Sequence, residues 1–321
     1  MIDKEKGVLK PIIQWVEVTP SHDGQRLDNF LIRLCKGVPK SHLYKAVRGG
    51  QVRVNKGRTS VDYRIQVGDV IRIPPFRMSQ PSPNAHRAPP KTFPIVFEDD
   101  GLLVIDKPPG VAVHGGSGVS HGVIESLRAA RPELAFLELV HRLDRDTSGL
   151  LMLAKRRQTL VALHQLMRDG QVRKHYVALV EGRFLNDRQH IRLGLTKWNT
   201  ISGERRVKVD ADGQAAHTIV SCLSRLAKYS LVDAELRTGR THQIRVHLAS
   251  TGHPIVGDDK YGNDQTRDFF KQNGFSRMFL HARTLSLIHP STGELLTLEA
   301  PVPALFEQAH AFVRDIKDES K

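Results

Sequence analysis

The hydrophobic pattern of the first 75 residues predicts a small unit of helices and short strands. Residues 26–36 repeat apolar side chains at helical spacing, which gives the helix one apolar face. That face consists of Leu27, Phe30, Leu31 and Leu34. A second helix is expected over 42–48, with Ser41 as its N-cap. Three segments have the alternating or apolar pattern of short strands: 14–19, 51–55 and 69–73.

From residue 95 onward the pattern predicts strands with helices inserted between them. Strands are expected at 95–98, 102–105, 150–154, 175–182, 189–196, 205–210, 215–223, 229–237, 279–288 and 295–299. Helices are expected at 122–131, 157–168, 240–250 and 304–317. Because the strands dominate and do not alternate regularly with helices, we expect an α+β fold with a mixed, mostly antiparallel sheet.

A proline-rich segment separates these two parts. Residues 77–94 contain five prolines together with Ser and Asn, and they have few side chains suited to a core. We therefore predict a small domain at 20–83, a linker at 77–94 and a large domain at 94–321. At 321 residues the chain is long enough for this division.

Positive charge is concentrated in the smaller part. The whole chain carries a net charge of +14, and residues 1–90 hold 16 Lys and Arg against 7 Asp and Glu. Such an excess is typical of proteins that bind a polyanion, and nucleic acid is favoured because no basic amphipathic helix with an aromatic face is present. Basic residues crowd the second helix and the following hairpin: Lys40, Lys45, Arg48, Arg53, Lys56 and Arg58. A solvated basic surface is the alternative interpretation.

The sequence offers no recognisable metal or cofactor motif. Its two cysteines, Cys35 and Cys222, lie far apart, and there is no C-x-x-C, phosphate-binding G-x-x-x-x-G-K-[ST], dinucleotide G-x-G-x-x-G after a strand or H-E-x-x-H. The N-terminal residues lack an apolar signal core, and no stretch approaches about 20 apolar residues. We therefore expect a soluble cytoplasmic protein without metal or cofactor.

The most informative chemistry lies in residues 141–149, H-R-L-D-R-D-T-S-G. They place the carboxylate of Asp144 between Arg142 and Arg145, next to an apolar run that predicts a buried strand. Positive neighbours favour the ionised form of a carboxylate, and an ionised carboxylate without metal ligands is a candidate nucleophile. From spacing alone an ordinary turn is the stronger interpretation, because Asp, Thr, Ser and Gly are turn formers.

Two later segments carry further candidates. Tyr176 lies in the alternating segment 174–180, K-H-Y-V-A-L-V, where core packing is its alternative fate. Arg245 lies in 237–248, R-T-G-R-T-H-Q-I-R-V-H-L, which also contains Arg240. We expect Arg245 to be on a helix that starts near Arg240, which would place Arg240 well for a phosphate.

These three segments, in this order, resemble the motifs of pseudouridine synthases of the ribosomal-large-subunit type. The resemblance covers about 94–304 and implies a mixed sheet with a cleft along its middle. It also implies that Asp144 is the catalytic carboxylate, that Tyr176 packs on the target uracil and could take its C5 proton, and that Arg245 pairs with Asp144. Arg142 could orient the loop or hold a phosphate. The reaction needs no metal and no cofactor.

Residues 24–74 resemble the S-four RNA-binding domain, which implies that the basic cluster there contacts phosphates. Together the resemblances imply an enzyme that isomerises specific uridines of 23S ribosomal RNA, free or in a pre-ribosomal particle, and that works as a monomer. Attack on C1′ of the ribose, abstraction of a ribose proton and addition to the uracil ring all remain open for Asp144.

Three other functions are compatible with parts of the sequence. The same reaction could act on transfer RNA. The basic N-terminal part could belong to a non-catalytic RNA-binding or ribosome-assembly protein, although binding alone does not require a carboxylate near RNA phosphates. Residues 118–122, G-V-S-H-G, match the G-x-S-x-G of serine hydrolases, but a Gly and Ser-rich spacer precedes them where a strand should stand.

Overall fold

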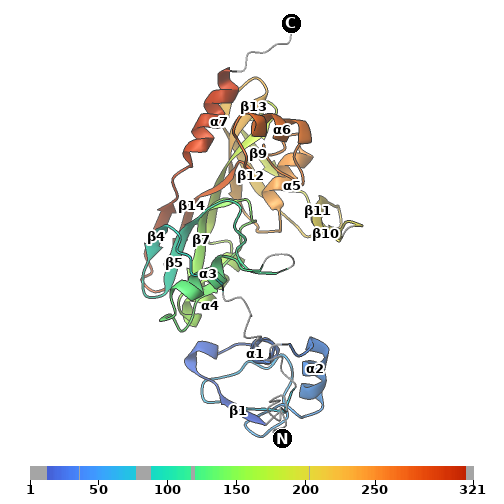
Figure 1. Cartoon of the computed structure of the whole chain (residues 1–321), viewed down its shortest axis with the longest axis vertical. Coiled ribbons are helices and arrows are strands. Elements are labelled where there is room, and N and C mark those ends of the chain that lie inside the picture. The colour runs from blue at the N-terminus through green and yellow to red at the C-terminus, as the bar shows by residue number, and fades with distance from the viewer. Residues whose placement is uncertain (1–12, 36, 77–87, 117–119, 202, 316–321) are drawn as a thin grey trace, which may run out of the picture. The chain divides into compact units, whose positions relative to one another are not determined.

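The computed structural model describes residues 13–35, 37–76, 88–116, 120–201 and 203–315 (Figure 1). The chain divides into two compact units, Met1–Arg87 and Ala88–Lys321. Each has its own hydrophobic core. Most of the predicted linker, 77–87, lies outside the described residues.

The N-terminal unit packs two helices on a three-stranded antiparallel sheet. Its elements are β1 (Gln14–Glu17), the short 3₁₀ helix η1 (Pro20–His22), α1 (Leu27–Leu34), α2 (Lys40–Arg48), β2 (Arg53–Val54) and β3 (Val70–Ile73). The strand order β1-β3-β2 places β1 at an edge, as its alternating sequence predicts. Leu27, Phe30 and Leu31 of α1 are buried against Leu43 and Val47 of α2.

Two details of this unit differ from the prediction. Leu34 is 38% exposed, because it lies at the last turn of α1, beyond the part of the helix that packs on the core. Ser41 is not the N-cap of α2, since the helix begins at Lys40, two residues before the predicted start, and Pro39 occupies the capping position. Proline has a φ angle suited to the start of a helix and needs no partner for its nitrogen.

The C-terminal unit is built on a ten-stranded sheet, and the hairpin β10–β11 lies apart from it. Its strands are β4 (Ile95–Glu98), β5 (Leu102–Lys107), β6 (Glu138–Leu139), β7 (Ser148–Ala154), β8 (Arg173–Glu181), β9 (Arg188–Ile191), β10 (Leu195–Asn199), β11 (Arg205–Val209), β12 (Thr218–Arg225), β13 (Tyr229–Leu236), β14 (Leu280–Ile288) and β15 (Leu295–Glu299). Its helices are α3 (Val123–Ala130), α4 (Arg157–Arg168), α5 (Gln243–Ser250), α6 (Asp264–Gln272) and α7 (Ala304–Asp315).

The strand order confirms the predicted fold class. The main path is β4-β5-β7-β14-β8-β13-β12-β9, with β15 paired to β14 and β6 to β7. The pairings are antiparallel except for β7 with β14, so the sheet is mixed and mostly antiparallel. The prediction of one strand over 189–196 was wrong, because Gly194 turns the chain between β9 and β10. The sequence pattern also missed α6 and β6.

The two faces of β8 pack against different hydrophobic layers, and the face that carries Tyr176 is the one next to α5. Tyr176 and Ala178 face the layer that contains Ile244 of α5. Val177 and Leu179 face the opposite way, into the layer that contains Phe306 of α7. This alternation follows from the two-residue repeat of a strand. Tyr176 is therefore fixed by a strand that is buried on both sides.

The start of β7 is fixed against β14 by close backbone contact. His281 pairs with Ser148 and Ala282 with Gly149. Gly149 has a φ of +106°, and a Cβ there would overlap the carbonyl of Ala282, so only glycine fits. The imidazole of His281 lies 2.9 Å from the Ser148 hydroxyl and 3.3 Å from the carbonyl of Ala300.

His281 predicts a loss of stability in mild acid. Burial lowers the pKa of His281 from 6.5 to about 4. Between these values the unfolded chain binds a proton that the folded chain refuses, so the free energy of unfolding falls as pH drops from 6.5 to 4. The His281→Gln variant should lose roughly 3 kcal/mol of this pH-dependent change. Urea unfolding at several pH values measures the slope, and an unchanged slope would contradict the assignment.

Candidate active site

Asp144 lies on the loop between β6 and β7, and its side chain is 26% exposed. The loop turns tightly after it, since the Thr147 N–H donates to the Asp144 carbonyl. Thr147 and Ser148 are buried and connect the turn to β7. Nη1 of Arg245 donates to Oδ2 of Asp144 at 3.2 Å. The structure therefore brings together two residues that are far apart in the sequence.

Arg245 is held by two further carboxylates. It is 3% exposed, and it donates to both oxygens of Asp258 at 2.7 and 2.6 Å and to Asp259 at 3.1 Å. The Asp258 side chain is fully buried and also accepts the N–H groups of Lys260 and Tyr261. Burial alone would lower the pKa of Arg245, but its hydrogen bonds and ion pair with Asp258 outweigh burial and raise it. The guanidinium is thus permanently charged and fixed in direction.

His242 lies beside the same carboxylate. Its Nε2 is 3.8 Å from Oδ1 of Asp144, and its Nδ1 is 2.8 Å from the hydroxyl of Tyr261. Burial lowers the pKa of His242, although the negative charge of Asp144 opposes this effect. The residue has a φ of +52°, which is strained for histidine and is often found at functional sites. A neutral imidazole whose Nδ1 accepts from Tyr261 directs its Nε2–H toward Asp144.

Tyr176 faces the same pocket from the floor of the sheet. It is buried, and its hydroxyl makes no hydrogen bond with the residues that the structure describes. Burial raises the pKa of Tyr176, and the charge of Asp144 raises it further. The phenol is therefore uncharged at neutral pH. It presents an aromatic face and a hydroxyl beside Asp144.

One pocket contains all five residues that the sequence nominated in this unit. It is lined by Arg142, Leu143, Asp144, Thr147, Tyr176, Leu236, Arg240, His242, Gln243, Ile244, Arg245 and Leu280. A second cavity adjoins it on the other side of Asp144, and Arg142 and Arg245 line both. Arg142 and Arg240 are exposed, so their charges are available at the rim.

Arg240 precedes the helix rather than starting it. Helix α5 begins at Gln243, and the loop before it is fixed by the Gln243 side chain. The Gln243 amide oxygen accepts from the Thr238 hydroxyl and the Arg240 N–H, and its nitrogen donates to the carbonyl of His217. These bonds replace the helical turn that the sequence pattern predicts. The Arg240 guanidinium donates to the carbonyl of Ala215.

The back of the Asp144 loop rests on a buried lysine. Lys107 is fully buried at the end of β5, and its ammonium donates to the carbonyls of Pro108, Val111 and Arg145 at 2.8–2.9 Å. Burial lowers the pKa of Lys107 to about 8. Since Arg145 directly follows Asp144, this lysine fixes the backbone that carries the carboxylate.

Sequence reasoning missed four of these residues. No motif or predicted element of the sequence includes Lys107, Asp258 or Tyr261. His242 was quoted within its motif without a role. The signal that could have identified Asp258 is the acidic pair of residues 258 and 259, which follows the apolar residues Ile255 and Val256 and precedes Lys260.

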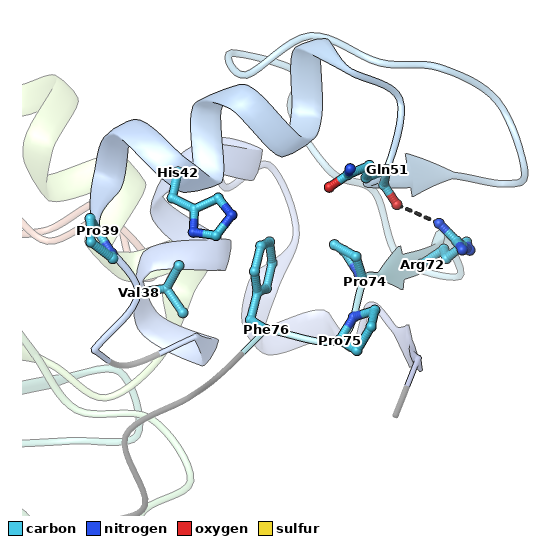
Figure 2. A pocket seen from close by; sticks show the side chains of 8 residues that line it. All are labelled: Val38, Pro39, His42, Gln51, Arg72, Pro74, Pro75 and Phe76. Atoms are coloured by element: carbon cyan, nitrogen blue, oxygen red, sulfur yellow. Dashed lines mark hydrogen bonds between the residues drawn. The ribbon is translucent and has the colours of Figure 1, made fainter. Parts of the chain in front are cut away.

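The predicted RNA-binding residues of the N-terminal unit lie on its surface. Lys40, Lys45, Arg48, Arg53, Lys56 and Arg58 are all exposed. Arg53 is tied to the carbonyls of Gly50 and Lys56, which fixes its direction. Figure 2 shows a hollow between the start of α2 and the end of β3, where the rings of His42 and Phe76 meet edge to face. Lys45 lines a neighbouring hollow on the same helix.

The remaining candidates find less support. Ser120 is exposed before α3, and the preceding strand β5 ends at Lys107, so no strand leads into the G-x-S-x-G segment, of which 118 and 119 lie outside the described residues. Within the described ranges, no group of three His, Cys, Asp or Glu side chains could hold a metal ion. No helix there has the length and apolar character to cross a bilayer.

Comparison with known proteins gives two family matches. Residues 101–250 match the RNA pseudouridylate synthase family, and residues 25–71 match the S4 domain. The first match includes all the residues of the pocket from the Asp144 loop to Arg245.

Curated relatives cover nearly the whole chain. Ribosomal large subunit pseudouridine synthase C of Yersinia pestis is 48% identical over 91% of this chain and 93% of its own length. The protein of that name from Escherichia coli K12 is 46% identical over 91% and 94%. The resemblance to the family that the motifs indicated is thus matched by similarity over nearly the whole chain to ribosomal large subunit pseudouridine synthase C.

A solved structure agrees with the fold. Human RNA Pseudouridylate Synthase Domain Containing 4 is 27% identical, covers 69% of this chain and 93% of its own, and has a TM-score of 0.57. The sequence motifs, the geometry of the pocket and the identity to these relatives all indicate the same family. The chain belongs to the RNA pseudouridylate synthase family, and it is a pseudouridine synthase that carries an S4 domain at its N-terminal end.

Proposed function

We propose that this enzyme converts specific uridines of large-subunit (23S) ribosomal RNA to pseudouridine. The observation that carries the proposal is the pocket in which Asp144 is paired with the buried Arg245 and faces Tyr176. The names of the relatives, which cover over nine-tenths of this chain, support the large ribosomal subunit as the source of the RNA.

Asp144 is the catalytic carboxylate in this proposal. One of its oxygens accepts from Arg245, while the other lies at a longer distance from His242 and faces the pocket. An oxygen without a strong hydrogen bond remains available for the ribose or the uracil ring. This arrangement suits attack on C1′, removal of a ribose proton or addition to the ring equally well.

Arg245 and Tyr176 hold the reacting partners in place. Arg245 holds the carboxylate in a fixed direction through its hydrogen bond, as a preorganised charge does in many active sites. Tyr176 offers its ring to the flipped-out uracil. Because its pKa is raised by burial and by Asp144, its phenolate form is disfavoured, which supports a stacking role over that of an acceptor for the C5 proton.

RNA is held outside the pocket by exposed basic groups. Arg142 and Arg240 stand at the rim, where phosphates that flank the target can reach them. The S4 domain adds Lys40, Lys45, Arg48, Arg53, Lys56 and Arg58. These groups raise affinity for structured RNA without changing the chemistry.

The proposed substrate also suggests the form of the RNA and the compartment in which the enzyme acts. We propose that the enzyme acts as a monomer on free or pre-ribosomal RNA in the cytoplasm, because uridines are accessible before the subunit is complete. The free thiols of Cys35 and Cys222 are compatible with that reducing compartment. Transfer RNA is the alternative substrate, and mapping pseudouridine in both RNA classes from cells with and without the protein decides between them.

Asp144→Asn should abolish pseudouridine formation while RNA affinity stays within a few-fold of wild type. Asparagine keeps the size of the side chain and can accept from Arg245, but it cannot act as a nucleophile or a base. Asp146→Asn is the matched control, because it makes the same change two residues later on the same loop and should stay active. Chemical mapping of pseudouridine in transcribed RNA measures both. Isomerisation by the Asp144→Asn variant would refute the assignment.

Asp258→Asn should lower the free energy of unfolding by about 3–5 kcal/mol, because it leaves a buried guanidinium without its main counter-ion. Asp259→Asn should cost less than about 1 kcal/mol, because that carboxylate is half exposed. Urea denaturation compares the two neighbours. Activity should fall much further in the first variant, and equal effects would show that Asp258 does not position Arg245.

Deleting residues 1–83 should weaken binding to structured RNA and reduce its salt dependence. The slope of log K against log salt should fall by roughly 0.7–0.9 for each phosphate that the S4 domain binds in the full chain. Filter binding at several salt concentrations gives the slope, and turnover of a short single-stranded substrate tests whether the catalytic unit remains folded. A slope equal to that of the full chain would remove the S4 domain from RNA binding.

A further inference from the structure

Two lysines are buried among the described residues of the catalytic unit, and their ammonium groups differ in their hydrogen bonds. The ammonium of Lys107 is satisfied by three carbonyls. Lys174 is only 9% exposed, yet its ammonium makes no hydrogen bond or ion pair with any residue that the structure describes. The side chain is mostly buried, but its Nζ is not among the fully buried atoms without a partner, so the ammonium can still be reached from solvent. A lysine in this situation is suited to receive an anion from outside the chain.

Lys174 lies on the same face of β8 as Tyr176, which lines the active-site pocket. It precedes Tyr176 by two residues on β8, and alternate residues of a strand face the same side. Tyr176 lines the pocket together with Leu236 of the neighbouring strand. Lys174 is therefore the next side chain on this face of β8 after Tyr176.

The Lys174 ammonium lies between the two loops that carry the site. On one side is Gly239, where an added Cβ would stand 3.9 Å from Nζ. On the other is His141, whose pKa is lowered to about 3, first by burial and then by the positive charge of Lys174. His141 begins the loop of Asp144, and Gly239 belongs to the loop before α5. The ammonium therefore lies close to the two loops whose residues Asp144 and Arg240 line the active-site pocket.

The charge of Lys174 is unopposed. Burial is the only influence that changes its pKa, and it lowers it, whereas a nearby carboxylate would raise it. The neighbouring Arg237, by contrast, is paired with Glu235 at 3.1 Å. Gly239 contributes no side chain that would cover Nζ. Among the described residues, Lys174 thus has an ammonium without a counter-ion next to these two loops.

We propose that Lys174 binds a backbone phosphate of the RNA substrate, one that flanks the target uridine and enters the cleft when the base is extruded. The inference rests on the proposed function, because phosphates are the anions that an RNA substrate brings to this position. A lysine acts there as a point charge that tolerates several phosphate orientations. Lys174 is a binding and positioning residue and takes no part in bond making.

Lys174→Met tests the proposal, because methionine keeps much of the length and removes the charge. RNA affinity should fall roughly tenfold, as expected when one hydrogen bond to a charged group is removed. The slope of log K against log salt should fall by about 0.7–0.9. Thermal unfolding should move to the same or a higher temperature, since an uncompensated buried charge has been removed. Binding is measured in the Asp144→Asn background, where the RNA stays unmodified.

Two further variants make the outcome decisive. Lys271→Met removes an exposed charge from α6 and should leave affinity and slope unchanged. Lys174→Arg keeps the charge and should keep the slope. Wild-type affinity and slope in Lys174→Met would overturn the proposal, and so would a loss of affinity that accompanies a lower unfolding temperature with no change of slope. Failure of the wild-type enzyme to modify ribosomal RNA would instead refute the proposed function.

Discussion

The active site depends on one buried guanidinium that is shared among three carboxylates. Asp258 takes two nitrogens of Arg245 in a bidentate pair, and Asp259 shares one of them. A single nitrogen is left for Asp144, which it meets through one oxygen. Without Asp258, the fork of Arg245 would be free to pair with both oxygens of Asp144 and would close the carboxylate to substrate. The buried pair therefore controls how much of Asp144 stays available.

The same constraint explains why the surrounding loops are tied down by backbone contacts. Lys107 binds the carbonyl of Arg145, and Gly149 approaches the backbone of β14 more closely than any side chain allows. His242 adopts a left-handed conformation at the start of α5. A buried ammonium, a close backbone approach and a left-handed histidine each cost stability or conformational freedom. Together they hold a carboxylate and a cation in one geometry before the RNA arrives, which lowers the reorganisation needed in the reaction.

The sequence allowed the sheet and most helices to be predicted, because these depend on periodic burial. Short motifs nominated the candidate site residues, and the structure brings these residues into one pocket. Asp144, Tyr176 and Arg245 come from three such motifs. Asp258 was beyond reach, since it lies in an irregular loop and its role exists only through a contact with Arg245. The start of α5 was misplaced for a similar reason: the Gln243 side chain replaces a helical turn with hydrogen bonds to the loop. Local pattern cannot reveal contacts made across the fold.

Charge is distributed in this enzyme according to what each cation must do. Arg245 is compensated by acidic residues, so its burial is tolerated and its direction is fixed. Arg142 and Arg240 stay in water, where desolvation costs nothing until RNA is bound. Lys174 falls between these cases, buried but unpaired. A mostly buried cation without a counter-ion destabilises the free enzyme. In our proposal a phosphate of the RNA supplies that counter-ion, and removing the destabilisation contributes to the free energy of RNA binding.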